Sequence, residues 1–195
     1  MELRTALLPI SITDVTRVYS SDDRFPVDDS QTKFQFAVAS TTVHGTRVEY
    51  SATFFASGGE PILDRDLTRW LCDRKQLMGR PGRSRVAVRV QFYVRVKFQS
   101  QGIATHLTHQ EERMFRRWGA TEIQIFAMES GRWVWTRNKF GYELFEAELP
   151  LVQQKYREWL RATTDTGTPP SRISEFPKEF LLSPAVGMLH LFKTL

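Results

Sequence analysis

Hydrophobic and polar residues alternate along two neighbouring stretches of the chain, Lys33–Thr42 and Thr46–Ala56. A period of two is typical of strands that bury one face. The residues Val43-His44-Gly45-Thr46 connect the two stretches, and Gly45 can adopt the positive φ that a tight turn needs. The pattern therefore predicts an antiparallel β-hairpin.

A different period follows the Gly58-Gly59 pair, where apolar residues recur at helical spacing. The apolar residues of this stretch are Leu63, Leu67, Trp70, Leu71, Leu77 and Met78. Gly79 and then Pro81 come next, and this order of residues commonly ends a helix. The stretch therefore predicts an amphipathic helix with one buried stripe.

A second alternation runs from Ser84 to Phe98 and predicts a long strand. One face carries valines and phenylalanines, and the other carries mostly Arg, Gln, Tyr and Lys side chains. A helix from Gly102 to Trp118, stopped by Gly119, and a buried strand over Thr121–Met128 follow. Because strand, helix and strand succeed one another as a βαβ unit, we expect the two strands to be parallel.

The two ends of the chain add further elements. Glu2–Leu8 reads as a strand, and a short helix capped by Ser11 or Thr13 reaches Tyr19. Residues 151–161 predict another helix, residues 163–170 resemble a linker, and residues 176–195 form an apolar appendage. We therefore expect an α/β domain over residues 1–162 and a C-terminal extension over residues 163–195 that packs on the same domain.

The composition narrows the class of protein. The 195 residues are 41% hydrophobic and 25% charged, which fits a globular domain and excludes fibrous and disordered classes. No run reaches the roughly 18 apolar residues of a membrane span, so we expect a soluble, cytoplasmic protein with no membrane partner. The single Cys72 excludes an internal disulfide and a multi-cysteine zinc site, and we predict no metal site.

The net charge of +5 is compatible with a polyanionic partner, but Lys and Arg are spread along the chain. The densest cluster, Arg80, Arg83 and Arg85, is short. A phosphate-bearing cofactor or plain solvation accounts for the charge better than a nucleic acid does.

The segment from Val94 to Ala104 ends a predicted strand and opens a predicted helix. Such a turn directs backbone amides and the positive end of the helix dipole at one point, which favours an anion. Gly102 carries no side chain to block a diphosphate, Ala104 is small, and Gln99 and Gln101 offer further donors. By itself the pattern is equally compatible with a tight connection that binds nothing.

The same segment resembles the acetyl-CoA motif of the GCN5-related N-acetyltransferase (GNAT) family, V-x-P-x-[YF]-[RQ]-x-x-G-x-[GA]. The positions that match are Val94, Phe98, Gln99, Gly102 and Ala104, and Val96 departs from the proline of the motif. The resemblance extends from Arg85 to Glu146 and continues through the order of the predicted elements. It implies a mixed, mostly antiparallel central sheet, splayed between two parallel strands and flanked by helices.

The resemblance also implies how a cofactor binds. The amides of Gln101, Gly102, Ile103, Ala104 and Thr105 would hold the diphosphate of acetyl-CoA or another acyl-CoA. The backbone at Val94 and Val96 would pair with the pantetheine amides. The thioester would then lie in the wedge between the splayed strands, near Met128 and Glu129.

Because of two departures from the family pattern, the resemblance does not identify the general base or the proton donor. The stretch from Ser84 to Phe98 contains no Asp, Glu or His, so the general base must be water or another residue. Glu129 is our first candidate, and His44 and Glu49 are alternatives. Where the family often has a proton-donating Tyr, this chain has Arg137, which cannot act as a general acid but can stabilise a departing thiolate unless it pairs with a surface carboxylate.

Taken together, the resemblance implies an N-acyltransferase, in which an amine attacks acyl-CoA directly in a ternary complex. The acceptor would be a small molecule or a protein, and the oligomeric state stays open. The alternative is a catalytically degenerate module that keeps the fold for binding or scaffolding. The tryptophan-rich stretch around Trp133 and Trp135 is similar to a divergent branch of the family found near phage and toxin genes.

Overall fold

The structure is a computed structural model, and it describes residues 12–20, 22, 25, 27–42, 45–74, 84–137, 140–163 and 166–195. The chain divides into two compact units, Met1–Ile123 with Leu195 and Gln124–Thr194. Both units combine helices with strands, and the strand pairs with an assigned direction are antiparallel. The expected mixed α/β class with a mostly antiparallel sheet is confirmed at this level. The predicted splay between two parallel strands stays a prediction.

In its described residues, unit 1 has four strands that follow one another across the sheet: β1 (Lys33–Thr42), β2 (Gly45–Thr53), β3 (Leu67–Arg74) and β4 (Ser84–Gln91), while the predicted strand Glu2–Leu8 lies outside those residues. β1 pairs with β2 from Lys33 opposite Thr53 to Thr42 opposite Gly45. The predicted hairpin is therefore confirmed. Of the four residues expected in its turn, Val43 and His44 lie outside the described part of the chain, while Gly45 and Thr46 belong to β2.

The amphipathic helix expected after Gly58-Gly59 is wrong, because Leu67–Arg74 forms β3. On one face of β3 the buried residues are Leu67, Arg69, Leu71 and Asp73, which alternate as strand residues do. Two of these four inward positions are charged, so the hydrophobic pattern concealed the period of two. The remaining apolar residues happened to lie at helical spacing.

The second predicted strand is also shorter than expected, since β4 ends at Gln91. Gln91 pairs with Thr68, the second residue of β3, so only Leu67 of β3 lies beyond this pair. The chain beyond Gln91 makes a single bridge, Val94 to Leu63, and then turns into a short 3₁₀ helix, η1 (Val96–Phe98). Arg89, expected on a solvent face of this strand, is 4% exposed.

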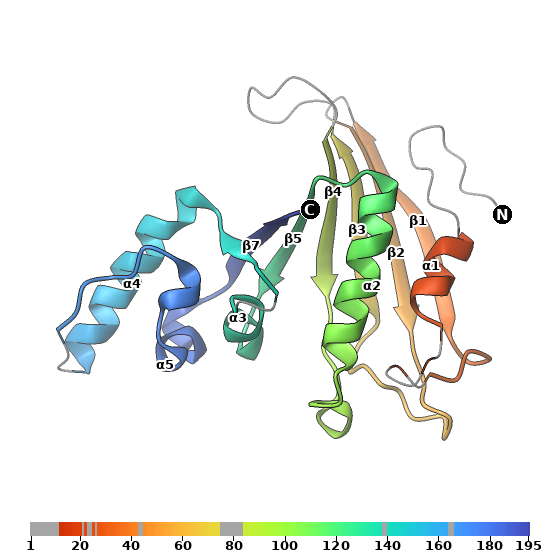
Figure 1. Ribbon diagram of the computed structural model, residues 1–195, viewed down its shortest axis with the longest axis horizontal. Coiled ribbons are helices and arrows are strands. Elements are labelled where there is room, and N and C mark those ends of the chain that lie inside the picture. The colour runs from red at the N-terminus through yellow and green to blue at the C-terminus, as the bar shows by residue number, and fades with distance from the viewer. Residues whose placement is uncertain are drawn as a thin grey trace. The chain divides into compact units, whose positions relative to one another are not determined.

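Two helices, α1 (Ile12–Val18) and α2 (Ile103–Trp118), lie against the same face of the four strands (Figure 1). Both were expected from the sequence, α2 almost to the residue. α2 ends at Gly119, whose φ of 84° is the left-handed conformation that glycine adopts most readily at a helix end. The buried stripe of α2 includes Leu107, Phe115 and Trp118, which fix the helix on the sheet.

In the second unit the strand order is β5–β7–β6, where β5 is Glu122–Ala127, β6 is Glu143–Leu144 and β7 is Leu189–Thr194. Its helices are α3 (Ser130–Trp135), α4 (Leu149–Ala162) and α5 (Lys178–Leu182). Short 3₁₀ helices cover Glu146–Glu148 (η2), Ile173–Glu175 (η3) and Pro184–Val186 (η4). The predicted strand over Thr121–Met128 and the predicted helix over residues 151–161 are confirmed.

The core of unit 2 is aromatic. Val152, Tyr156 and Leu160 form the buried stripe of α4. The ring of Tyr156 lies 5.2 Å from that of Phe176 and 5.0 Å from that of Phe180, both at steep angles. Edge-to-face pairs of this kind add to the free energy of burying the rings. The apolar C-terminal residues therefore pack directly against α4.

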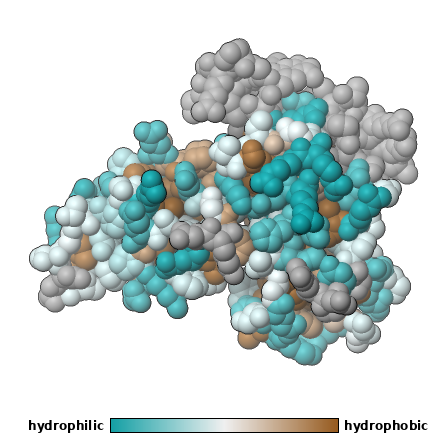
Figure 2. Space-filling view, in the orientation of Figure 1, coloured by the Kyte–Doolittle hydropathy of each residue, from teal (hydrophilic) through white to brown (hydrophobic). Residues whose placement is uncertain are grey.

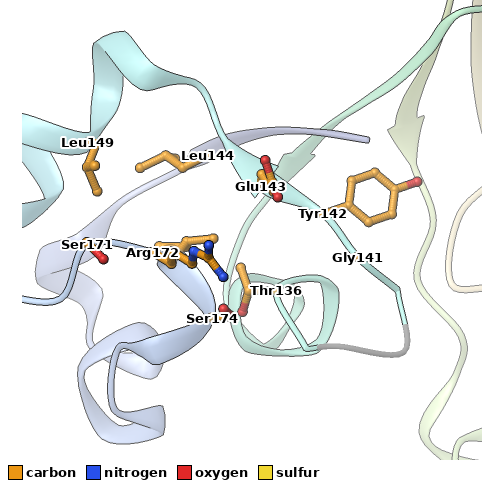
Figure 3. Close-up of a pocket in the computed structure, with 10 residues that line it drawn as sticks. Thr136, Gly141, Tyr142, Glu143, Leu144, Leu149, Ser171, Arg172 and Ser174 are labelled. Carbon is orange, nitrogen blue, oxygen red and sulfur yellow. The ribbon is translucent and has the colours of Figure 1, made fainter. Parts of the chain in front are cut away.

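A pocket of about 520 Å³ lies within unit 2 (Figure 3). It is bounded by the end of α3, by β6, by the start of α4 and by η3, and its lining includes Arg172 and Glu143.

The exposed large hydrophobic side chains are dispersed along the chain rather than concentrated in one segment. They are Tyr93, Val96, Met128, Leu151, Leu182 and Met188. Figure 2 shows apolar residues scattered among hydrophilic ones on the visible face. Among the described residues, no helix has both the length and the apolar character of a membrane span.

Candidate functional site

The turn before α2 has the backbone geometry that the sequence analysis required of it. Gly102 is the N-cap residue, with φ 81° and ψ −1°, and no side chain caps the helix. A Cβ built on Gly102 meets no atom within 4 Å, so the described residues leave the space in front of the turn open. A side chain at this position would extend into that space and would strain the backbone.

The backbone amides at this turn have no hydrogen-bond partner among the described residues. Among the described residues, no protein oxygen accepts a hydrogen bond from the amides of Gln101, Gly102, Ile103, Ala104 or Thr105. The first paired amide is that of His106, which donates to the carbonyl of Gly102 at 2.9 Å. Helix α2 therefore presents a set of free donors and the positive end of its dipole at one place.

The two glutamines of the turn hold its shape. Gln99 donates from Nε2 to the carbonyl of Val94 at 2.8 Å, and Gln101 donates from Nε2 to the carbonyl of Lys97 at 3.0 Å. Ser100 lies between them with a φ of 62°, an uncommon conformation for a residue other than glycine. The side-chain amides of Gln99 and Gln101, which we expected to be available to a ligand, therefore donate to carbonyls near the turn.

Val94 forms an isolated antiparallel bridge with Leu63, which leaves its own N–H and C=O out of the bridge. The bridge between them is closed by hydrogen bonds from Asp64 to the carbonyl of Tyr93 and from Arg95 to the carbonyl of Ile62. In such a bridge the N–H and C=O of Val94 point to the opposite edge. Val96 belongs to η1, where its carbonyl accepts from the amide of Gln99 at 3.1 Å and its side chain is 77% exposed.

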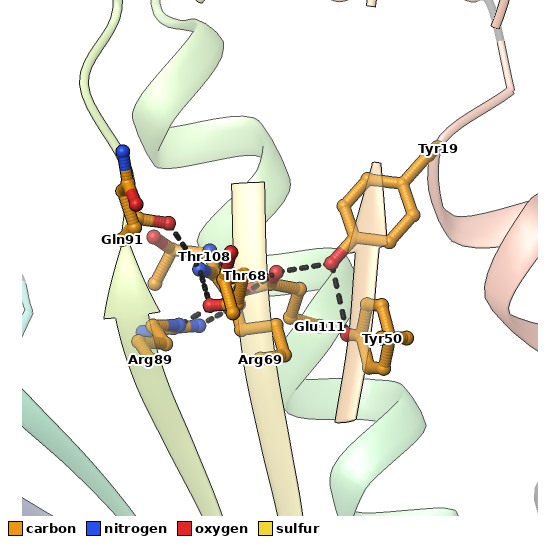
Figure 4. A network of polar contacts seen from close by, with 8 residues as sticks. All are labelled: Tyr19, Tyr50, Thr68, Arg69, Arg89, Gln91, Thr108 and Glu111. Atoms are coloured by element: carbon orange, nitrogen blue, oxygen red, sulfur yellow. Dashed lines mark hydrogen bonds and ion pairs between the residues drawn. The ribbon is translucent and has the colours of Figure 1, made fainter. Parts of the chain in front are cut away.

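Behind the turn, a buried ion-pair network holds α2 on the sheet (Figure 4). Glu111 of α2 accepts from Nε of Arg69 at 2.8 Å and from Nε of Arg89 at 2.7 Å. Arg69 also donates to the carbonyl of Gln91 at 2.8 Å, and Arg89 donates to the carbonyl of Thr108 at 3.3 Å. The network therefore ties α2 to β3 and β4, and so fixes the direction in which the N-terminus of α2 points.

Two buried tyrosines complete this network. Tyr19, which follows α1, donates its hydroxyl hydrogen to Glu111, and its oxygen lies 3.0 Å from the hydroxyl oxygen of Tyr50 in β2. Glu111 and Tyr19 are each 1% exposed and Tyr50 is fully buried. One carboxylate thus joins α1 and α2 to three strands.

The protonation states of these groups follow from their surroundings. Burial by itself raises the pKa of the Glu111 carboxyl, but the positive charges of Arg69 and Arg89 outweigh burial and hold this pKa below its ordinary value of 4.5. Burial, followed by the negative charge of Glu111, raises the pKa of Tyr19 well above 10.0, and burial also raises the pKa of Tyr50. At neutral pH Glu111 is therefore ionised and both tyrosines carry their protons.

The two predicted catalytic residues belong to unit 2. Glu129 is exposed and precedes α3 with a φ of 48°. The guanidinium of Arg137 lies 4.8 Å from the centre of the Trp133 ring, and its buried Nε has no hydrogen-bond partner within the described part of the chain. Arg137 makes no ion pair with a described carboxylate, so a contact with tryptophan takes the place of the surface salt bridge that we considered.

Of the other two candidates for the general base, the structure describes only Glu49. His44 lies outside the described residues. Glu49 of β2 accepts a hydrogen bond from Nε1 of Trp70 at 2.8 Å. In the described part of the chain, no three His, Cys, Asp or Glu side chains gather closely enough to hold a metal ion.

Sequence reasoning missed His190 of β7, whose ring is in contact with two aromatic rings. Its ring centre lies 4.5 Å from that of Phe126 and 4.3 Å from that of Phe145. Nε2 lies 3.2 Å from Oε1 of Gln124, and Nδ1 lies 3.8 Å from Oε1 of Glu148. A lone histidine between Leu189 and Leu191 in an alternating stretch was the available signal.

It also missed the network around Glu111. The available signal was a glutamate within the helical stripe formed by Leu107, Met114, Phe115 and Trp118. An acidic residue in such a stripe needs a buried positive partner, which Arg69 and Arg89 provide.

Comparison with models of known families, with curated proteins and with solved structures finds no match to this chain. The resemblance to the GNAT family therefore stays a prediction that rests on the turn and its motif.

Proposed function

We propose that this chain is an N-acyltransferase of the GNAT type, which moves an acetyl or related acyl group from acyl-CoA to an amine. The observation that carries the proposal is the set of unpaired amides from Gln101 to Thr105 in front of an open Gly102. Free backbone donors at the positive end of a helix favour a diphosphate, which accepts several hydrogen bonds at once.

The neighbouring backbone supports the same ligand. The N–H and C=O of Val94 face away from the protein bridge to Leu63, as a partner with amide groups requires. The carbonyl of Val94 already accepts from Gln99, so the side chain of Gln99 must rotate if pantetheine is to use this carbonyl. Rotation of an exposed side chain is a small cost.

The reaction that we propose is direct transfer in a ternary complex. The nitrogen of the neutral amine forms a bond with the thioester carbon, and the bond from that carbon to sulfur breaks. A base, for which we propose Glu129, takes the proton that the amine loses. We assign to Arg137 the stabilisation of the CoA thiolate, and this role is supported by its Nε, for which no described residue is a hydrogen-bond partner.

A direct test measures thiol release from acetyl-CoA with a panel of small amines. We expect release above the rate of hydrolysis with at least one amine, and a loss of about tenfold or more in the variant Glu129→Gln. If CoA binds but no amine causes thiol release, the proposal of catalysis fails and a non-catalytic CoA-binding module replaces it.

The cofactor site has its own test in the variant Gly102→Leu. The leucine side chain extends into the open space in front of the free amides, so we expect acetyl-CoA binding to be lost. Gly119→Ala is the control, because Gly119 has almost the same φ, 84° against 81°, at the other end of α2. Unchanged affinity in Gly102→Leu would contradict the site.

The degenerate module is the second candidate, and one observation favours it. Glu111 is the buried carboxylate nearest to the turn along α2, and it is committed to two arginines. A carboxylate in that state has a lowered pKa and is a weak base. Catalysis therefore depends on a residue outside this network.

A further inference from the structure

The pocket in unit 2 contains two opposite charges that do not pair with each other. Arg172 and Glu143 both line it, and within the described residues neither side chain makes an ion pair or a hydrogen bond. Figure 3 shows the guanidinium of Arg172 extending into the space beside Thr136, with the carboxylate of Glu143 across from it.

Both charges are carried by ordered backbone. Glu143 lies in β6 and pairs with Phe192 of β7. Arg172 precedes η3, and its amide donates to the carboxylate of Glu175 at 3.2 Å. Both side chains are exposed, so the backbone fixes where each charged group is attached, and the side chains themselves can adjust to a ligand of matching charge.

The remainder of the lining combines apolar residues with polar ones. Leu144 is 9% exposed and Ile173 is 3% exposed, and Leu149 lies beside them in the lining. The hydroxyl of Thr136 donates to the carbonyls of its own helix, at 2.9 Å to Arg132. The side chains available for polar recognition therefore include one cation, one anion and the hydroxyl groups of Ser171 and Ser174.

We propose that this pocket binds a small zwitterion, an α-amino acid with an apolar side chain. The carboxylate of the ligand would accept two parallel hydrogen bonds from the guanidinium of Arg172, and its ammonium group would donate to Glu143. The apolar side chain of the ligand would lie on Leu144 and Ile173. A volume of about 520 Å³ is in the range of small-molecule sites.

L-Leucine added to the full-length protein, followed by ligand-observed NMR, tests the proposal without any CoA. The inference therefore stands or falls independently of the acyltransferase proposal. We expect leucine to bind, and we expect 3-methylbutylamine and 4-methylpentanoate, which each lack one of the two charges, to bind at least about threefold more weakly. No binding of leucine, or equal binding of either analogue, would overturn the inference.

Variants then locate the binding. Arg172→Gln and Glu143→Gln should each weaken leucine binding by about threefold to tenfold, whereas the exposed controls Arg157→Gln and Glu146→Gln should leave it unchanged. Equal loss in the controls, or no loss in one of the two pocket variants, would show that the pocket does not recognise both charges. Because the analogues test the same charges on the unaltered chain, the inference remains testable even if a variant fails to fold.

Discussion

The two units of this protein build their cores in different ways. Unit 1 buries a glutamate, two arginines and two tyrosines between its sheet and its helices, and these groups satisfy one another. Unit 2 buries a cluster of aromatic rings around Tyr156 and Phe180, and its buried Arg132 donates to backbone carbonyls rather than to a carboxylate. The first core is directional and depends on the ionisation of one residue. The second depends on area and shape.

The difference bears on function because the polar core contacts α2, the helix whose N-terminus forms the candidate cofactor site. Glu111 fixes α2, and the N-terminus of α2 carries the free amides. A buried ion pair gives no certain gain in stability over apolar packing, but it specifies one arrangement of the elements that it joins. We interpret the network as the device that orients this turn.

The largest effect that we predict comes from Glu111→Gln. The substitution leaves two buried guanidinium groups without their anion, and we expect a loss of about 3–5 kcal/mol in the free energy of unfolding of unit 1. Denaturant unfolding followed by circular dichroism measures it. Glu158→Gln on the exposed face of α4 is the control and should stay within about 0.5 kcal/mol of the parent. A loss below about 1 kcal/mol for Glu111→Gln would refute the network's role.

A smaller effect separates the two kinds of buried tyrosine. Tyr19→Phe removes a hydroxyl that bonds with Glu111 and with Tyr50, and should cost about 1–2 kcal/mol. Tyr156→Phe removes a hydroxyl without a hydrogen bond to any described residue, and should cost less than about 0.5 kcal/mol. Equal costs in the same unfolding experiment would erase the contrast between the two cores.

The smallest effect concerns pH. Because the folded pKa of Glu111 is lowered, the stability that it contributes is present above its ordinary value of 4.5 and declines as pH falls toward the folded value. The raised pKa values of the tyrosines act in the opposite direction, so stability also declines as pH rises above about 10. Unfolding curves across pH measure both, and the acid slope should be weaker in Glu111→Gln. An unchanged acid slope would assign it to other carboxyls.

Prediction from the sequence succeeded where the buried residues are apolar and failed where some of them are charged. The helix over residues 149–162 was found because Val152, Tyr156 and Leu160 mark an apolar stripe. The strand over Leu67–Arg74 was mistaken for a helix because Arg69 and Asp73 occupy inward positions. Hydrophobic periodicity assumes that buried residues are apolar, and it fails where a core buries charges.

The local features of the candidate site could be predicted from the sequence, whereas its long-range contacts could not. The position of the turn, the N-cap at Gly102 and the end of α2 at Gly119 follow from local residue preferences. The partners of Glu111 come from β3 and β4, and the neighbours of His190 come from β5 and the segment before η2, so no local pattern identifies them. Contacts between segments that lie far apart in the sequence could therefore not be predicted.

The account depends most on the amides in front of Gly102, and a titration of isotope-labelled protein with acetyl-CoA observes them directly by NMR. We predict that the amide signals of Gln101 to Thr105 shift most, and that the shifts saturate with the cofactor. If those five signals stay in place at millimolar acetyl-CoA while the protein remains folded, the turn does not bind a diphosphate and the proposed function is wrong.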